Sequence, residues 1–456
     1  MASTYLNRSV TTTQADSARY KFTVSFWIKC SEATPNTYIW QDYYSEAYRT
    51  FLKFNSGTIH FRSKNNSSDV VQLKSNQLFR DIHGWYHFVV VGDSTQATAS
   101  DRVKIYVNGE QITSLSIATY INQNTGFEIA NNSWSQQIGA RNNSGSFSEH
   151  FSGSMSHFHY TESYAYAPTD FGETDATTGE WKIKTSPSIT YGTNGFFILK
   201  DGNSVTDQSG NSNNFTVGGG TLTKTEDCPS NVFCTLNRLN SYQPTGTINI
   251  QYGNTGFEDG ENGSNYSYAS GTLGANSGKF YWETKVIDLA EIDQVGVVLA
   301  STNFMGAANS DGLQSTTYGG KGCQFSNGYK VGDGAQSAYM GGFSANDIMM
   351  IALDLDNNKI TFGRNGQWAD GSGNANQTYA NSTPAYTNLT AGELYFPAQA
   401  KRASGSNYGT NWYNFGNGYF QTTAVSSSGT NASNNGIFEY DVPTGFTALS
   451  TKGLNL

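Results

Sequence analysis

Residues 348–368 read IMMIALDLDNNKITFGRNGQW, and this stretch constrains the fold more than any other part of the chain. An apolar run precedes a turn at Asp356, Asn357 and Asn358, and a second run ends at an Asn365–Gly366 turn. Turns rich in Asn and Gly favour the positive φ angles that close tight antiparallel hairpins. The segment therefore predicts consecutive antiparallel β-strands.

The composition extends this prediction to the whole chain. Charged residues make up 14% of the 456, against about 25% in typical soluble proteins, and 49 residues are Gly. No segment shows a sustained apolar period of helical spacing. The length allows two or three domains that each bury a core of their own. We predict an all-β chain made of two consecutive antiparallel β-sandwiches.

The first half carries five motifs in order. They are YKFTVSFWIK (residues 20–29), GWYHFVVVGD (84–93), RVKIYVNGEQI (102–112, with an Asn108–Gly109 turn), SQQIGARN (135–142) and an apolar closing strand within 151–171. Together they resemble a laminin G-like, concanavalin A-like jelly roll over residues 1–175. That resemblance implies a sandwich that often holds calcium at its rim.

The second half carries four motifs. They are GKFYWETKVIDLAEIDQVGVVLAS (278–301), the 348–368 hairpin, GELYFPAQA (392–400) and NWYNFGNGYF (411–420). In this order they resemble a SPRY domain over most of residues 246–440. SPRY domains are β-sandwiches that bind through their loops and are not enzymes, so the resemblance implies surface recognition.

The segment between the halves, DCPSNVFCTLN (227–237), resembles a connector found in marine bacteriophage structural proteins. Residues 191–216 resemble the tail that the jelly rolls of those proteins carry, and residues 439–456 resemble the close of such chains. We therefore expect a laminin G-like jelly roll at 1–225, a connector at 226–237, a SPRY-like sandwich at 238–442 and a C-terminal tail at 443–456.

Charge and hydropathy limit the partners. The net charge is −9, and no Lys/Arg run offers a groove for phosphates, so nucleic acid is not expected. The chain contains no run of 18 apolar residues, so membrane insertion is not expected. The start, MASTYLNRSVTTT, lacks the basic and apolar regions of a secretory signal. Synthesis in a host cytoplasm followed by use on the surface of a virion reconciles these features with an adhesin-like composition.

The expected function is that of a non-enzymatic bacteriophage surface protein, a fibre, spike or appendage that recognises a host glycan or receptor. One alternative is a decoration or connecting protein that binds only other virion proteins, and another is a carbohydrate-active enzyme on a jelly-roll scaffold. Because Tyr is abundant and repeated weak sites gain avidity, we also expect a homo-oligomer, with a trimer favoured.

Aromatic residues in expected loops are the candidate ligand contacts: Tyr43, Tyr44, Trp134 and Phe147. Exposed rings pack on sugars while neighbouring amides and carboxylates bond hydroxyls. The alternative for each ring is a subunit interface or a local packing anchor. The tryptophans within strand motifs are expected in the core: Trp27, Trp85, Trp282 and Trp412.

The sequence offers few candidate metal ligands. Asp93 and Asp101 are candidate calcium ligands, although carboxylates that cap turns explain them as well. No cofactor other than calcium is expected. His157 and His159 alternate on one strand, with His150 and His87 in neighbouring motifs, but the polar face of a half-buried strand explains such spacing more often than a transition metal.

Catalysis and disulfides are not expected. Glycoside hydrolysis needs two facing carboxylates, and the pairs with suitable spacing, Glu173/Asp175 and Glu291/Asp293, lie in expected loops or hairpin tips. Two cysteines, Cys30 and Cys323, fall on expected strands, and Cys30 is predicted to be a buried apolar side chain. Cys228 and Cys234 are close enough to bridge, but a reducing cytoplasm argues against it.

Overall fold

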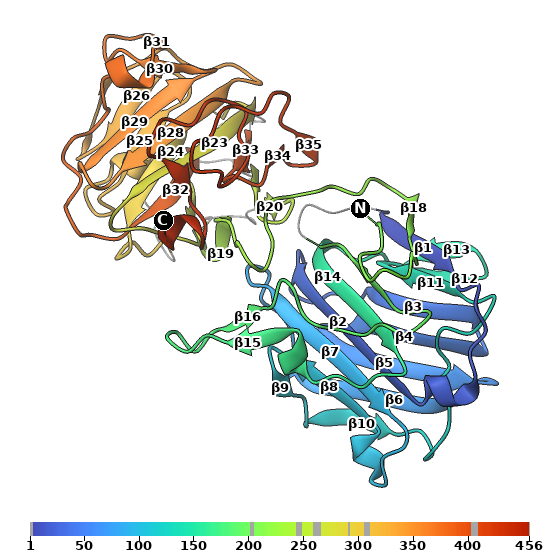
Figure 1. The fold of residues 1–456 in the computed structure, drawn as a ribbon. Coiled ribbons are helices and arrows are strands. Elements are labelled where there is room, and N and C mark those ends of the chain that lie inside the picture. The colour runs from blue at the N-terminus through green and yellow to red at the C-terminus, as the bar shows by residue number, and fades with distance from the viewer. Residues whose placement is uncertain are drawn as a thin grey trace. The chain divides into compact units, whose positions relative to one another are not determined.

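The computed structural model describes residues 3–200, 205–242, 249–258, 266–290, 292–304, 311–402 and 409–455. These residues form antiparallel β-sheets joined by turns and a few short 3-10 segments, and no α-helix occurs among them (Figure 1). The predicted all-β fold class is therefore confirmed. The chain divides into two compact units, Met1–Lys224 and Thr225–Leu456. Within the described ranges, no helix is long and apolar enough to cross a membrane.

The first unit contains two large sheets. The eight-stranded sheet runs β10 (Leu115–Thr119), β6 (Ser68–Leu78), β5 (Thr58–Asn65), β4 (Tyr48–Asn55), β3 (Tyr38–Ser45), β11 (Ser135–Ile138), β1 (Tyr5–Ser9), β18 (Thr216–Gly219). The six-stranded sheet runs β17 (Phe196–Ile198), β14 (Gly153–Glu162), β2 (Lys21–Cys30), β7 (Tyr86–Asp93), β8 (Val103–Val107), β9 (Glu110–Gln111). Figure 1 shows the six-stranded sheet lying over β3 to β6.

Strict alternation on β2 builds the core between these sheets. Every second side chain, Phe22, Val24, Phe26 and Ile28, is fully buried in one hydrophobic cluster. Cys30 continues that row at 2% exposure, as predicted from its position in the alternation. Burial raises the pKa of its thiol to about 12, which leaves Cys30 a neutral apolar side chain.

Two small hairpins complete the first unit. They are β12 (Arg141–Asn143) with β13 (Ser146–Ser148), and β15 (Gly172–Thr174) with β16 (Trp181–Ile183). In Figure 1 the β15–β16 hairpin lies beside β7 and β8. Its Trp181 donates a hydrogen bond to His87 on β7. The face of the six-stranded sheet turned away from the core is therefore partly covered.

The second unit also contains two large sheets. The seven-stranded sheet runs β19 (Leu236–Tyr242), β22 (Ser267–Gly271), β32 (Tyr395–Arg402), β24 (Ile292–Leu299), β25 (Lys321–Gln324), β26 (Tyr329–Gly332), β27 (Ala335–Ala338). The nine-stranded sheet runs β20 (Asn249–Gln251), β21 (Gly256–Glu258), β33 (Thr410–Asn414), β23 (Lys279–Asp288), β28 (Ile348–Asp354), β29 (Lys359–Arg364), β30 (Gln367–Ala369), β31 (Ala375–Gln377), with β36 (Thr447–Ala448) beside β23. The short pair β34 (Tyr419–Phe420) and β35 (Thr423–Ala424) follows β33.

The hairpins predicted for residues 348–368 are present as β28, β29 and β30. All of β28 is buried, and the carboxylate of Asp354 accepts hydrogen bonds from Asn357 in the first turn. The second turn has φ of 50° at Asn365 and 84° at Gly366. Positive φ at both central positions is the geometry of the tight hairpin turn that Asn-Gly favours.

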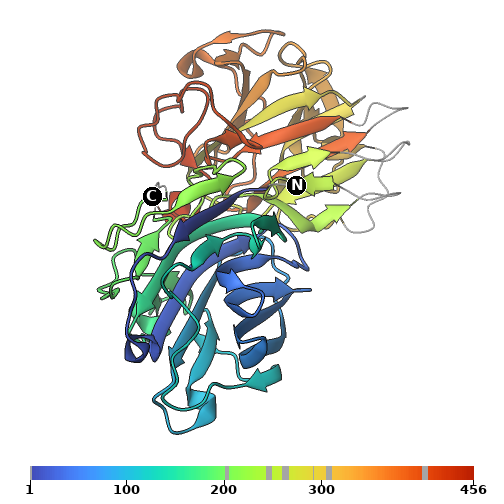
Figure 2. The same ribbon diagram turned by 90° about the vertical axis from the view of Figure 1, so that its right-hand side faces the viewer.

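The expected connector and tail both pack within the second unit. Phe233 and Cys234 are buried, and the Cys234 amide donates to the carbonyl of Leu449. In the closing segment, β36 pairs in parallel with β23 and Phe446 is buried (Figure 2 gives a second view of these layers). Both ends of the unit therefore contribute to one sandwich. No disulfide joins Cys228 to Cys234.

Candidate functional site

Two of the four candidate aromatic residues are not exposed loop residues. Tyr43 lies on β3 at 5% exposure, and its hydroxyl is 3.1 Å from the hydroxyl of Ser144. Trp134 immediately precedes β11 and is 6% exposed. Tyr43 was predicted in a loop but lies on a strand, and Trp134 lies in the connection before β11 but is buried, because β3 and β11 pair with Ser135 opposite Tyr43.

The other two candidates form separate ring pairs. Tyr44 is 61% exposed and stacks on Trp134, with ring centroids 6.2 Å apart and 17° between the planes. Phe147 is half-buried on β13 and stacks on Tyr5 at 4.2 Å. Only Tyr44 offers the open ring face that a ligand contact needs, so the four residues do not assemble into one site.

The candidate calcium ligands are engaged by their neighbours. The carboxylate of Asp93 accepts hydrogen bonds from Thr95 and Gln96 and lies 3.5 Å from the ammonium of Lys21. Asp101 forms an ion pair of 2.9 Å with Lys104. Asp93 thus caps the turn after β7, and each of the two carboxylates is bound by neighbouring side chains. The described ranges contain no group of three or more His, Cys, Asp or Glu placed to hold a metal ion.

Three histidines of the first unit are buried on the six-stranded sheet: His87, His157 and His159. His87 stacks with Trp27 and bonds Ser25, and burial lowers its pKa to about 3. His159 lies 2.9 Å from the hydroxyl of Tyr191, and burial lowers its pKa well below the usual range. A bulge in β14 gives one extra residue between Ser156 and His159. His157 and His159 nevertheless lie on one side of the strand as predicted, because both rings contact Phe197. Burial therefore holds the imidazoles of His87 and His159 in the neutral form.

The carboxylate pairs with catalytic spacing also have structural partners. Glu173 and Asp175 lie on the exposed β15–β16 hairpin and both approach Lys182. Asp293 is fully buried, 3.0 Å from the ammonium of Lys401, and accepts hydrogen bonds from Asn411. Glu291 lies outside the described residues. A buried, paired Asp293 has no route to a substrate.

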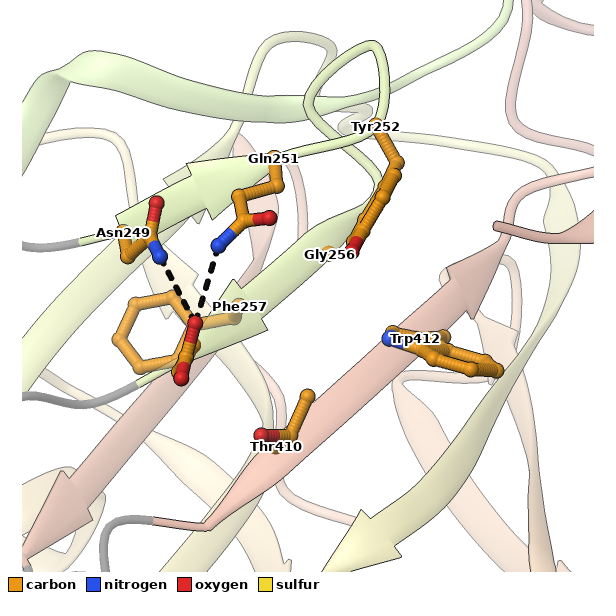
Figure 3. Close-up of a pocket in the computed structure, with 8 residues that line it drawn as sticks. Asn249, Gln251, Tyr252, Gly256, Phe257, Thr410 and Trp412 are labelled. Atoms are coloured by element: carbon orange, nitrogen blue, oxygen red, sulfur yellow. Dashed lines mark hydrogen bonds between the residues drawn. The ribbon is translucent and has the colours of Figure 1, made fainter. Parts of the chain in front are cut away.

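A pocket of about 170 Å³ lies on the nine-stranded sheet of the second unit (Figure 3). Its lining comes from strands β20, β21 and β33 and the turn between the first two: Asn249, Gln251, Tyr252, Gly256, Phe257, Glu258, Thr410, Trp412. The pairing register of the three strands brings these residues together. Asn249 and Gln251 pair with Glu258 and Gly256, which in turn pair with Thr410 and Trp412. Side chains opposite one another in antiparallel strands share a face.

Because side chains alternate between the two faces of each strand, the residues between those that face the pocket point into the core. The intervening residues Ile250, Phe257 and Asn411 are at most 1% exposed and point between the sheets. Gly256 has no side chain, and a Cβ there would meet the Tyr252 ring at 2.9 Å. The glycine therefore leaves a hollow between Tyr252 and Trp412.

The polar chemistry of the pocket centres on Glu258. One of its oxygens, Oε2, accepts hydrogen bonds from the amide of Asn249 at 2.7 Å and the amide of Gln251 at 2.9 Å (Figure 3). The rings of Tyr252 and Trp412 meet edge to face with centroids 6.4 Å apart. An anchored carboxylate beside two aromatic rings is suited to binding a small polar ligand with an apolar face.

No sequence motif pointed to this pocket, and the prediction that Trp412 lies in the core was wrong. Trp27 and Trp282 are buried as predicted, at 4% and 0% exposure, whereas Trp85 and Trp412 are only half-buried. The period of NWYNF was the available signal. Because Tyr413 is apolar and core-facing, its neighbour Trp412 must face outward on β33.

The first unit matches the model of a known protein family. Residues 4–164 match the laminin G family model described as the concanavalin A-like lectin/glucanases superfamily. No curated protein matches the chain in sequence.

Similar solved structures include the SPRY domain of human HERC1, at 16% identity over 39% of this chain and 96% of that one, with a TM-score of 0.30. A native heptameric SAP-like pentraxin from Limulus polyphemus matches at 20% identity over 36% of this chain and 72% of that one, with a TM-score of 0.26. A human SPRY domain matches at 11% identity over 36% and 93%, with a TM-score of 0.27. The chain thus carries a laminin G-like, concanavalin A-like domain in its first unit, and SPRY domains are among its structural neighbours.

Proposed function

We propose that this protein is a non-enzymatic surface protein of a bacteriophage virion, a fibre, spike or appendage that recognises a glycan on the host cell. The observation that carries recognition is the pocket on β20, β21 and β33. It combines an oriented carboxylate, Glu258, with the aromatic side chains of Tyr252 and Trp412 on an open sheet face. Sugars present hydroxyls at their edge and C–H groups on their face, and this arrangement complements both.

The composition of the pocket favours binding over hydrolysis. Glu258 is the only carboxylate among its lining residues, whereas glycoside hydrolysis uses two carboxylates about 5 to 10 Å apart. Moreover, Glu258 is held by two amide donors, which suits a fixed acceptor of hydrogen bonds better than a proton shuttle.

The virion setting rests on the sequence resemblance to marine bacteriophage structural proteins, carried above all by residues 227–237. A protein of this kind would be made in the host cytoplasm and displayed on the particle beside other virion proteins. A decoration or connecting protein remains the alternative, and it would have no need of a sugar pocket.

The full-length protein should be retained on an array of immobilised bacterial surface polysaccharides without releasing reducing ends from them. Tyr252→Ala combined with Trp412→Ala should abolish retention, because both ring faces are lost. Tyr44→Ala, an exposed ring of the first unit, is the matched control. Retention that survives the double substitution, or that disappears only with Tyr44→Ala, would place recognition elsewhere. Release of reducing ends would instead establish an enzyme.

A further inference from the structure

The geometry points to a neutral hexopyranose as the ligand of the β20–β21–β33 pocket, with discrimination against sugars that carry a carboxylate. This inference rests on the proposed glycan recognition and adds the class of sugar. It follows from the hydrogen-bonding state of Glu258, the aromatic walls and the sign of the charge in the pocket.

Glu258 is held with one oxygen engaged and one available. Both amide donors, from Asn249 and Gln251, bond Oε2. No described residue donates a hydrogen bond to Oε1. The two amides fix the plane of the carboxylate, so Oε1 is oriented before a ligand arrives. A carboxylate oxygen accepts the O–H of a sugar strongly, because a hydrogen bond to an ionised acceptor is stronger than one between neutral groups.

The walls of the pocket supply an apolar surface. Tyr252 is 47% exposed, and positive φ of 56° turns it out of the β20–β21 hairpin. The indole nitrogen of Trp412 is itself buried, so this ring contributes apolar surface and no donor to the pocket. A pyranose ring fits such a site with its C–H face on the exposed ring of Tyr252 and a hydroxyl on the carboxylate of Glu258.

The charge of the pocket gives the discrimination. Glu258 is the only charged residue among the lining residues. Lys285 lies opposite Trp412 in the strand register, but its ammonium is placed over the ring of Phe420 at 5.9 Å. A uronic acid would therefore bring a second carboxylate beside Glu258 without a cation to offset it. At a partly exposed site this repulsion should weaken binding by about tenfold at low salt.

The test compares sugars that differ only at C6. Saturation-transfer NMR titrations of the full-length protein at pH 7 and low salt would use methyl glucoside, galactoside and mannoside. They would be compared with the methyl glycosides of the corresponding uronic acids, whose C6 carboxylate is free. We expect a neutral glycoside to bind with a dissociation constant on the order of 1 mM, as few atoms are buried. Its uronide should bind about tenfold more weakly, and added salt should narrow the difference.

Substitution of Glu258 identifies the cause of the preference. Glu258→Gln keeps the shape of the side chain but removes the charge, so the ratio of neutral to uronide affinity should fall to about one. Glu393→Gln, at an exposed glutamate of the same unit, makes the same change in net charge and should leave the ratio unchanged. Trp412→Phe keeps an aromatic wall and should also leave the ratio unchanged. Melting temperatures of all variants establish that they fold.

The outcomes separate this inference from the proposed function. If the protein is retained on polysaccharides but binds neutral and uronide sugars equally, the inference is overturned and glycan recognition stands. The same holds if polysaccharides bind but no hexopyranoside does, or if Glu258→Gln leaves the preference intact. If neither polysaccharides nor any sugar binds, both fail.

Discussion

Glu283 shows how a single buried side chain attaches the end of the second unit. Its carboxylate accepts hydrogen bonds of 2.9 Å from the backbone amides of Glu439 and Tyr440, one of 2.9 Å from the hydroxyl of Tyr281 and one of 3.2 Å from Asn414. Four donors from three parts of the chain meet at one group. Glu283 thus ties the segment after β35 to the face of the nine-stranded sheet.

Burial gives this residue a dependence on pH. It raises the pKa of Glu283 from 4.5 to about 7, despite the four donors. A group whose pKa is higher in the folded state contributes stability that is fully present below pH 4.5 and lost as pH rises through 7. The free energy of unfolding of the wild type, relative to Glu283→Gln, should fall by about 2 to 3 kcal/mol between pH 5 and 8. Scanning calorimetry over this range checks it, and parallel curves for the two proteins would contradict it.

Individual positions were predicted from the sequence where one physical requirement dominated. Cys30 and Trp282 are buried because each continues an apolar row on a strand. The outward position of Trp412 was not predicted because of its neighbour Asn411. A polar residue in a strand is expected to face outward, which would turn Trp412 inward. Its amide instead bonds the carboxylate of Asp293 within the core. Single-strand patterns do not reveal a buried partner that comes from a distant strand.

At the scale of elements, the β15–β16 hairpin acts as a cover for the outer face of the six-stranded sheet. Trp181 stacks on His87 with centroids 5.9 Å apart and donates its N–H to the ring at 3.0 Å. Burial holds the pKa of His87 at about 3, so its stability contribution is present above pH 6.5 and lost as pH falls toward 3.

Replacing Trp181 should therefore have two effects. Trp181→Ala should raise the pKa of His87 toward 6.5, because water reaches the imidazole, and should destabilise the first unit by about 2 kcal/mol through lost burial. Trp181→Phe retains a stacked ring and should show a smaller change in both quantities. Histidine resonances in an NMR pH titration and thermal denaturation measure them. An unshifted His87 in Trp181→Ala would mean that the hairpin does not shield it.

The turns of hairpins were the most predictable elements. Asn108–Gly109 has φ of 48° and 84°, as its sequence predicts. Ser144–Gly145 adopts the same geometry, with φ of 52° and 88°, on a weaker signal. By contrast, the strand position of Tyr43 and the burial of Trp134 next to β11 were missed, because pairing between β3 and β11 joins segments that local sequence does not connect.

These two turns allow backbone strain to be separated from packing. A Cβ at Gly145 would meet nothing within 4 Å, so Gly145→Ala should cost about 1 kcal/mol from positive φ alone. A Cβ at Gly109 would lie 2.6 Å from the ring of Trp181. Gly109→Ala should therefore cost at least about 1 kcal/mol more. Urea denaturation of both variants decides it, and equal losses would show that the ring moves aside freely.

At the scale of the whole molecule, the first unit closes on itself. Strand β18 pairs with β1, and Phe215 beside it is buried against Phe196 at 4.7 Å. Residues 1–224 expressed alone should give a single cooperative thermal transition, since the core and both sheets lie within them. Residues 1–200, which lack β18 and Phe215, should melt at a lower temperature. A longer fragment that is molten and protease-labile would mean that the two units share a core.

Self-association of the chain would strengthen its binding to a glycan-covered surface. A pocket of about 170 Å³ buries little of a polar sugar, so one copy would bind host glycans weakly. Repeating the pocket in a symmetric assembly makes later contacts intramolecular and raises avidity by about 10² to 10⁴. The 28 tyrosines suit such an assembly, because their rings bury area while their hydroxyls tolerate water. We propose a homotrimer packed through sandwich faces. Light scattering coupled to size-exclusion chromatography at micromolar concentration should give three times the 49.6 kDa mass of the chain, whereas a single-chain mass would contradict self-association in solution.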